Sequence, residues 1–254
     1  MLLSIVTITK DDSAGLKRTL LSTLRLREAG VEQIVVDGSA DPSLARTAME
    51  QAEAAGVTLL HQPPAGISLA FNTGLAVARG RWVWFLNGGD AVHATLEPGW
   101  LLTLLEATTS EVVVGSLQFD GETSPRSQPA LPYLWPLVAC WIGHPAALVR
   151  RDRVLARGAF KTRWKIAMDY DFWFRALDRR VPVDIVSVPF AHFDVTGVSE
   201  NPLTRGFARK EAAAVVLRHS LSLVCESGWI FLRVVKRVVI ALGQWIRWSA
   251  GKSP

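Results

Sequence analysis

Cysteine is scarce in this sequence, and several familiar ligand-binding motifs are missing. Cys140 and Cys225 lie far apart, with no CxxC pair or Cys/His cluster, which argues against a disulfide framework and a zinc site. No GxGxxG or GxxxxGKS/T segment is present, so neither the usual dinucleotide fingerprint nor a P-loop is expected. The N-terminus has no basic segment before its apolar residues, and we expect a first strand of a cytoplasmic protein there, not a signal peptide.

Acidic residues are absent from residues 229–254, and this absence accounts for the net charge of +5. That segment holds five basic residues, whereas the rest of the chain carries equal numbers of bases and acids. An even balance over the main part of the chain argues against a broad nucleic-acid-binding face, so no nucleic acid partner is expected. With 254 residues, we predict one α/β domain over 1–220 and a C-terminal helix over 221–254.

Short apolar segments alternate with segments of helical periodicity along the chain. Apolar, β-branched and aromatic residues predict strands, and leucines or alanines at three- and four-residue spacing predict the helices between them. This alternation is typical of βαβ units and predicts an α/β fold with a mostly parallel sheet. The predicted strands are 2–9, 33–37, 57–61, 81–86 and 111–116.

Polar residues stand where the predicted strands end. Thr7 and Thr9 close the first strand, Asp37 the second, and Asn87 with Asp90 the fourth. The carboxyl ends of the strands form the ligand-binding edge of an open α/β sheet. In the segment RWVWFLNGGD, two glycines let the backbone approach a bulky ligand, and the final aspartate offers oxygen to a hard cation. The alternative is a surface turn with a solvated aspartate.

A second group of acidic residues lies in KIAMDYDFWFRALDRR, residues 165–180. Asp169 and Asp171 precede the apolar residues of a predicted helix, and Asp169 is expected to cap that helix, which favours its ionised form. An ionised, partly buried carboxylate suits a general base for a sugar hydroxyl. Arg175 is expected to pair with Asp171, and the alternative is contact with a phosphate. The alternative is that both acids are only helix caps.

Taken together, these segments resemble family-2 glycosyltransferases of the GT-A fold, over about residues 2–180. The order and spacing of the segments make the match more specific than any single motif. The resemblance implies a Rossmann-like, mostly parallel sheet flanked by helices, and a member of the bacterial polysaccharide-synthesis type. HFDVTGVS is similar to the segment that closes the active site in such members. The other matching segments are SIVTITKDD, QIVVDGSAD, GISLAFNTGLAVARGRWVWFLNGGD, HPAALVRRD and GAFKTRWKIAMDYDFWFR.

The resemblance also implies roles for individual residues. Asp90 would hold a divalent cation, Mn²⁺ or Mg²⁺, on the diphosphate of a nucleotide sugar, and Asp169 would be the catalytic base. Asp37 would hydrogen-bond the nucleotide base, either uracil or guanine. The residues implied to bind the nucleotide-sugar donor are Thr7, Thr9, Asp37, Asn72 and Asn87.

The implied reaction is an inverting transfer to a hydroxyl of a glycan or lipid-linked acceptor. Asp169 accepts the hydroxyl proton, and the cation stabilises the departing diphosphate. The chain departs from the family pattern at NGGD, with one acid where many members have two, and at Met168, where many have glutamate. His144 either contacts substrate or is structural. The alternatives are a nucleotidyltransferase, although its basic glycine-rich loop is missing, and a non-catalytic nucleotide-sugar-binding scaffold.

The segment from Trp229 to Trp248 predicts a helix with one narrow basic face. Arg233, Lys236 and Arg237 recur at helical spacing among tryptophan and aliphatic residues. Several cations in so short a segment make a poor membrane span, but they suit a helix lying on anionic lipid. We therefore expect a protein peripheral to the inner face of the cell membrane, in surface polysaccharide assembly. The alternative is a helix that packs on the catalytic domain or on a second copy in a homo-oligomer.

Overall fold

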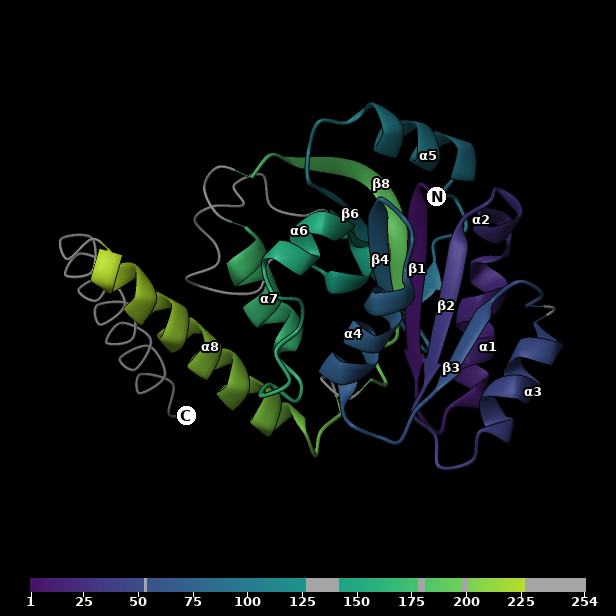
Figure 1. The fold of residues 1–254 in the computed structure, drawn as a ribbon, viewed down its shortest axis with the longest axis horizontal. Coiled ribbons are helices and arrows are strands. Elements are labelled where there is room, and N and C mark those ends of the chain that lie inside the picture. The colour runs from purple at the N-terminus through teal and green to yellow at the C-terminus, as the bar shows by residue number, and fades with distance from the viewer. Residues whose placement is uncertain (53, 127–141, 178–180, 198–200, 227–254) are drawn as a thin grey trace, which may run out of the picture. The chain divides into compact units, whose positions relative to one another are not determined.

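The computed structural model describes residues 1–254 except 53, 127–141, 178–180, 198–200 and 227–254. The predicted basic helix over 229–248 lies outside the described residues. Strands and helices alternate as the sequence predicts (Figure 1). The strands are β1 (Leu3–Thr9), β2 (Glu32–Asp37), β3 (Thr58–His61), β4 (Trp82–Asn87), β5 (Ala91–Val92), β6 (Val112–Phe119), β7 (Ala147–Arg150) and β8 (Val183–Phe193). The helices are α1 (Ser13–Ser22), α2 (Leu24–Glu28), α3 (Ser43–Gln51), α4 (Ile67–Val77), α5 (Pro98–Ala107), the short 3₁₀ helix η1 (His144–Ala146), α6 (Arg151–Ala156), α7 (Met168–Ala176) and α8 (Arg205–Glu226).

The eight strands form one sheet in the order β3-β2-β1-β4-β7-β6-β8-β5. The β1–β2, β1–β4, β2–β3 and β6–β8 pairs are parallel, which confirms the expected βαβ half of the fold. β7 lies antiparallel between β4 and β6, and the short β5 pairs antiparallel with β8. In the parallel half, Thr9 pairs with Asp37 and Ile8 with Asn87, so three strands end at the same edge.

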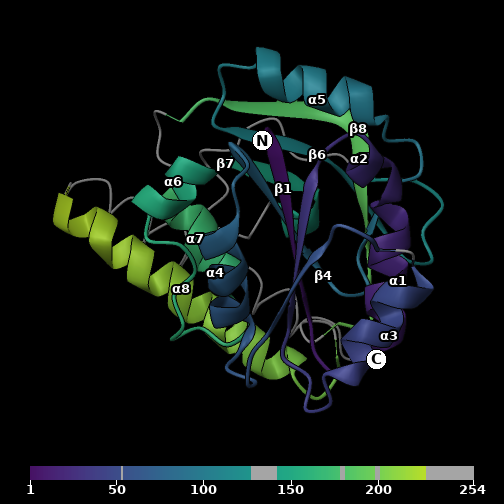
Figure 2. The ribbon, with the colours of Figure 1, turned by 45° about the vertical axis from the view of Figure 1, so that its right-hand side comes forward.

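Helices cover both faces of the sheet, because successive side chains of each central strand point to opposite faces. On β1, Val6 packs with α4, α6 and α7, whereas Ile5 packs in a second cluster with α2 and α5. A third cluster joins Val35 of β2 to α1 and α3. Figure 2 shows α4, α6 and α7 on one side of β1 and α1 and α3 on the other. Strands buried on both faces explain the continuous apolar runs in the sequence.

Gly74 sets how closely α4 approaches the sheet. A Cβ atom at this position would lie 2.3 Å from Cγ1 of Val6 and 3.2 Å from Cγ2 of Val36. Glycine therefore allows the helix to rest directly on β1 and β2, and the turn that precedes α4 borders the ligand edge of the sheet.

The contacts of the chain divide it into two units, Met1–Ala212 and Ala213–Pro254. The first unit contains the sheet and the helices that flank it, and it ends within α8. Within the described part of the chain, every helix is too short or too polar to cross a membrane.

Candidate active site

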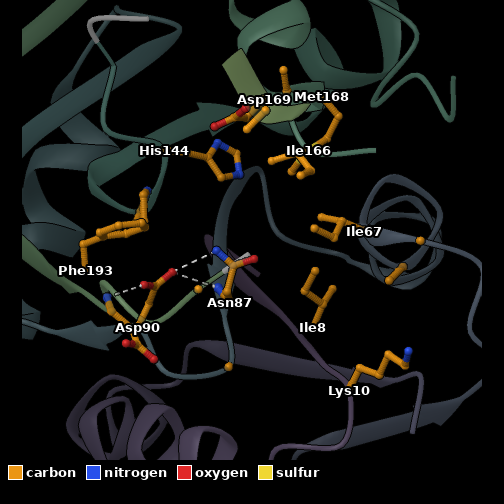
Figure 3. A pocket seen from close by; sticks show the side chains of 18 of the residues that line it. Ile8, Lys10, Ile67, Asn87, Asp90, His144, Ile166, Met168, Asp169 and Phe193 are labelled. Atoms are coloured by element: carbon orange, nitrogen blue, oxygen red, sulfur yellow. Dashed lines mark hydrogen bonds between the residues drawn. The ribbon is translucent and has the colours of Figure 1, made fainter. Parts of the chain in front are cut away.

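A cavity of about 1110 Å³ opens at the carboxyl ends of β1 and β4. Thr9 reaches it from β1, Asn87 and Asp90 from the end of β4 and the following turn, and Asp169 from the first turn of α7. In Figure 3, Asp169 lies beside His144, with Asp90 across the cavity from it. The structure thus gathers at one cavity polar residues that are distant in sequence.

Asp90 is held by its own turn and is only 1% exposed. Its Oδ2 accepts hydrogen bonds from the backbone N–H (3.1 Å) and the side-chain amide (3.0 Å) of Asn87. Gly89 allows this geometry, because its φ of 104° lies in a region that favours glycine. Burial raises the pKa of Asp90 to about 6, although these hydrogen bonds oppose the shift. The carboxylate is therefore an oxygen donor that gains from a cation partner.

Asp194 brings a second carboxylate to this turn, and the sequence did not single it out within HFDVTGVS. It directly follows β8, and its backbone N–H donates to Oδ1 of Asp90 at 3.1 Å. A Cβ on Gly89 would lie 2.3 Å from Oδ2 of Asp194, so glycine is also required for this close approach. The Oδ1 atom of Asp194 accepts from the backbone N–H and the hydroxyl of Thr196.

The two carboxylates fit a hard divalent cation such as Mn²⁺ or Mg²⁺. Such ions take oxygen ligands, and substrate phosphates commonly complete the shell. The charge of Asp194 is one of the causes that raise the pKa of Asp90, which shows that the two groups are near each other. Among the described residues, no cluster of three or more His, Cys, Asp or Glu side chains suited to a metal ion occurs. A cation here would therefore depend on ligands from a bound substrate.

Asp169 lies in the first turn of α7, and the expectation that it caps this helix is wrong. The N-cap residue is Ala167, and Oδ1 of Asp169 accepts the backbone N–H of Tyr170 at 2.7 Å. Burial raises the pKa of Asp169 to about 6, although hydrogen bonding opposes the shift. The expectation of a carboxylate stabilised in its ionised form is therefore also wrong. A carboxylate with this pKa at a cavity wall is instead well matched to accepting a proton near neutral pH.

Asp171, two residues further on, forms ion pairs inside the protein. It is fully buried, and its carboxylate pairs with Arg175 at 2.8 Å and with Arg163 at 3.3 Å. The predicted Asp171–Arg175 pair is thus confirmed. Arg175 also donates to the backbone carbonyl oxygens of Arg157 and Ala159, which ties α7 to the segment before it.

Thr7 and Thr9 differ in depth along β1. Thr9 lines the cavity, and its hydroxyl donates to the backbone carbonyl oxygen of Asp12. Thr7 lies one strand repeat deeper, is fully buried, and accepts a hydrogen bond from the side-chain amide of Gln33 at 3.3 Å. Thr7 is not among the residues that line the cavity.

Asp37 and Asn72, two further predicted donor-binding residues, also lie outside the cavity lining. Asp37 is buried, and its carboxylate contacts the backbone N–H of Ser39 at 2.9 Å and Nδ1 of His61 at 3.1 Å. Asn72 forms two hydrogen bonds with the backbone of Phe160, at 2.8 and 3.0 Å. In this structure Asn72 therefore joins α4 to the segment that leads into α7.

His144 lines the cavity from η1 and is 5% exposed. Its ring stacks on Phe85 and meets the edges or faces of Phe71, Phe160 and Trp173. Burial lowers its pKa to about 4, so the imidazole is neutral at physiological pH. Neither ring nitrogen has a hydrogen-bond partner among the described residues. His144 is therefore a neutral, buried polar group beside Asp169 (Figure 3).

Comparison with known sequences identifies a family and two similar proteins. The family described as "Glycosyl transferase family 2" matches residues 4–181. An uncharacterized glycosyltransferase of Mycobacterium tuberculosis, Rv1514c, is 28% identical over 206 residues, which are 78% of this chain and 77% of the relative. The uncharacterized protein MT1568 of the same species is 27% identical over 203 residues, covering 70% of this chain and 62% of its own length.

Solved structures share the fold. S. aureus TarS superposes with a TM-score of 0.65 at 17% identity over 87% of this chain, but this chain spans only 40% of that one. The mannosyltransferase PcManGT of Pyrobaculum calidifontis, in complex with GDP-Man and Mn²⁺, has a TM-score of 0.61 at 16% identity, covering 87% and 64% of the two chains. These likenesses show the α/β GT-A fold. Because the family match covers residues 4–181, more than half of the chain, the chain belongs to glycosyl transferase family 2.

Proposed function

We propose that this protein is an inverting glycosyltransferase that moves a sugar from a nucleotide-diphosphate sugar to a hydroxyl of a glycan or lipid-linked acceptor in surface polysaccharide assembly. The observation that carries the proposal is the placement of Asp90 and Asp169 at one cavity, at the carboxyl ends of β1 and β4. The family supports it, as do neighbours of the same fold whose structures contain UDP, UDP-GlcNAc, or GDP-Man with Mn²⁺.

The donor is proposed to bind with its diphosphate at the turn after β4. Asp90 and Asp194 would hold the divalent cation, Mn²⁺ or Mg²⁺, and Asn87 keeps Asp90 oriented through two hydrogen bonds. A cation bound there supplies positive charge that stabilises the negative charge growing on the departing nucleotide diphosphate. Thr9 lines the same cavity and is proposed to contact the donor. Donor binding by Thr7, Asp37 and Asn72 stays a prediction.

Asp169 is the proposed general base. Its carboxylate accepts the proton of the acceptor hydroxyl while the hydroxyl oxygen forms a bond to the anomeric carbon. The bond from that carbon to the diphosphate oxygen breaks, and its electron pair leaves with the nucleotide. Attack from the face opposite the nucleotide inverts the anomeric configuration. With a pKa of about 6, Asp169 is mostly ionised near pH 7.5 and still basic enough to accept the proton.

Transfer and hydrolysis assays with a panel of nucleotide sugars and Mn²⁺ test the proposal, with the anomeric configuration of the product read by NMR. Replacing Asp169 with asparagine should lower turnover about 10²- to 10⁴-fold. Replacing Glu106, an exposed residue on α5, with glutamine is the matched control and should leave turnover unchanged. Nucleotide binding without turnover by the unaltered protein would point instead to a binding scaffold.

Attachment to the inner face of the cell membrane is a separate proposal, supported by the basic amphipathic pattern of residues 229–248. Reversing Lys236 and Arg237 to glutamate in the full chain should abolish co-sedimentation with anionic lipid vesicles. If the reversed protein still co-sediments, the helix is not the anchor. A change in oligomeric state of the reversed protein would support the alternative, packing against a second copy.

A further inference from the structure

Glu211 of α8 is a buried carboxylate that binds the backbone just before α7. Glu211 is distant from that segment in sequence and is only 8% exposed. Oε2 accepts the backbone N–H groups of Lys165 (3.1 Å), Ile166 (2.7 Å) and Ala167 (3.1 Å), and Oε1 accepts that of Lys165 at 2.9 Å. One carboxylate therefore fixes three successive peptide groups.

These peptide groups lead directly into the helix that carries the proposed base. The first N–H groups at a helix start have no partner within the helix, and a side chain usually caps them. Ala167, the N-cap residue of α7, has no side-chain oxygen to do so. The first helical bond of α7 runs from the N–H of Asp171 to the carbonyl oxygen of Ala167. Of the three N–H groups that Glu211 accepts, that of Ala167 lies at the N-terminus of α7, and those of Lys165 and Ile166 belong to the segment that leads into it. Glu211 thus holds from α8 the backbone from which α7 starts.

Glu211 acts from behind the cavity wall. Ile166, Ala167 and Asp169 line the cavity, as do Ala208 and Ala212 on α8, whereas Glu211 is not a lining residue. The Glu211 carboxylate therefore joins two parts of one wall, the start of α7 and the beginning of α8, without facing the substrate space itself.

We propose that Glu211 is a positioning residue that fixes the backbone at 165–167 and thereby places the carboxylate of Asp169 against the acceptor hydroxyl. This inference rests on the proposed function, because Glu211 would affect turnover only by positioning Asp169, the proposed base. The nucleotide side of the cavity is built from other elements, the end of β1 and the turn at Asp90. Loss of Glu211 should therefore impair the chemical step and spare nucleotide binding.

Steady-state kinetics and nucleotide binding separate these effects. Glu211→Ala should lower kcat about 100-fold, because a displacement of about 1 Å in a catalytic group has that effect. Calorimetric Kd values for UDP or GDP with Mn²⁺ should stay within about twofold of the unaltered protein. Glu211→Gln should recover part of kcat, since one amide oxygen can accept the N–H groups of Ile166 and Ala167. Lys210→Ala, an exposed neighbour, is the matched control and should match the unaltered protein.

Two further measurements separate positioning from a general structural role. Combined with Asp169→Asn, Glu211→Ala should cause no further loss of turnover, whereas independent effects would multiply. Amide hydrogen exchange should rise at residues 165–169 in Glu211→Ala and Glu211→Gln, and not in Lys210→Ala. Unchanged exchange, unchanged kcat, or an equal loss of nucleotide affinity would overturn the inference. An unaltered protein with no turnover on any nucleotide sugar would instead overturn the proposed function, while the exchange data still decide the role of Glu211.

Discussion

Replacing Asp169 with asparagine is expected to make the folded protein more stable near neutral pH while it removes turnover. Burial raises the pKa of Asp169 from its ordinary value of 3.8 to about 6, so the folded state binds this proton more tightly than the unfolded chain does. The stability that the group contributes is present below pH 3.8 and is lost as the pH rises through 6. A shift of about 2 pKa units corresponds to about 3 kcal/mol lost at pH 7.5.

Asparagine avoids this loss because it has nearly the same shape and no charge. Its amide oxygen can still accept the N–H of Tyr170, the bond that the carboxylate makes at 2.7 Å. The variant should therefore be up to about 3 kcal/mol more stable at pH 7.5, which for a chain of this size raises Tm by about 6–12 °C. The gain should shrink to about 1 kcal/mol at pH 4.5, where the folded carboxyl group is mostly protonated.

Thermal unfolding followed by circular dichroism at both pH values, with EDTA and no nucleotide, measures this difference. Asp171→Asn on the same helix is the control with the opposite sign. Its buried carboxylate pairs with Arg175, whose side chain is 16% exposed, and with the more exposed Arg163, so its loss removes the anion from the partly buried Arg175 and should cost about 3 kcal/mol. An Asp169→Asn variant that is no more stable than the unaltered protein at pH 7.5, or a gain independent of pH, would refute the reasoning.

Three other substitutions probe the cation site and the fold. Mn²⁺ with UDP or GDP at a concentration 100 times Kd should stabilise the unaltered protein by about 2.7 kcal/mol, measured as a rise in Tm, and Asp90→Asn should abolish that rise. Gly74→Ala should destabilise the fold by about 1–3 kcal/mol in urea unfolding, because the new methyl would lie 2.3 Å from Cγ1 of Val6. Glu32→Gln should cost about 1–3 kcal/mol at neutral pH. Burial alone would raise the pKa of Glu32, but hydrogen bonds, first that from Ser4, lower it overall. The difference in unfolding free energy between Glu32→Gln and the unaltered protein should therefore shrink as acid protonates the carboxyl group. Urea unfolding at a series of falling pH values measures this.

The parallel half of the fold follows from local sequence, whereas the place of β7 does not. Runs such as WVWF and IVV are too apolar for a half-exposed strand, so they predict strands covered on both faces. Sequential strands most often lie side by side, which would put β4 next to β6. Instead Leu148 of β7 pairs with Trp84 of β4 on one side and with Val113 of β6 on the other. That insertion depends on pairing between distant segments, and no local pattern encodes it.

Some features of the candidate site likewise follow from local sequence, and others depend on contacts between distant segments. Polar residues at strand ends predicted the cavity edge, yet Thr7 lies one strand repeat inside the edge that Thr9 reaches, and Gln33 covers it. A polar residue at the end of an apolar run thus predicts which edge of the sheet borders the cavity, but not whether that residue reaches the cavity. The supporting residues come from much further away: the backbone N–H of Asp194 donates to Asp90 across 104 positions, and that of Ala167 donates to Glu211 across 44. Glu211 stands inside a helix, away from any apolar run that ends in an acid, whereas Asp194 directly follows β8 and could have been noticed as another acid at a strand end. Only the folded chain shows that each of them supports a carboxylate that the sequence had already singled out.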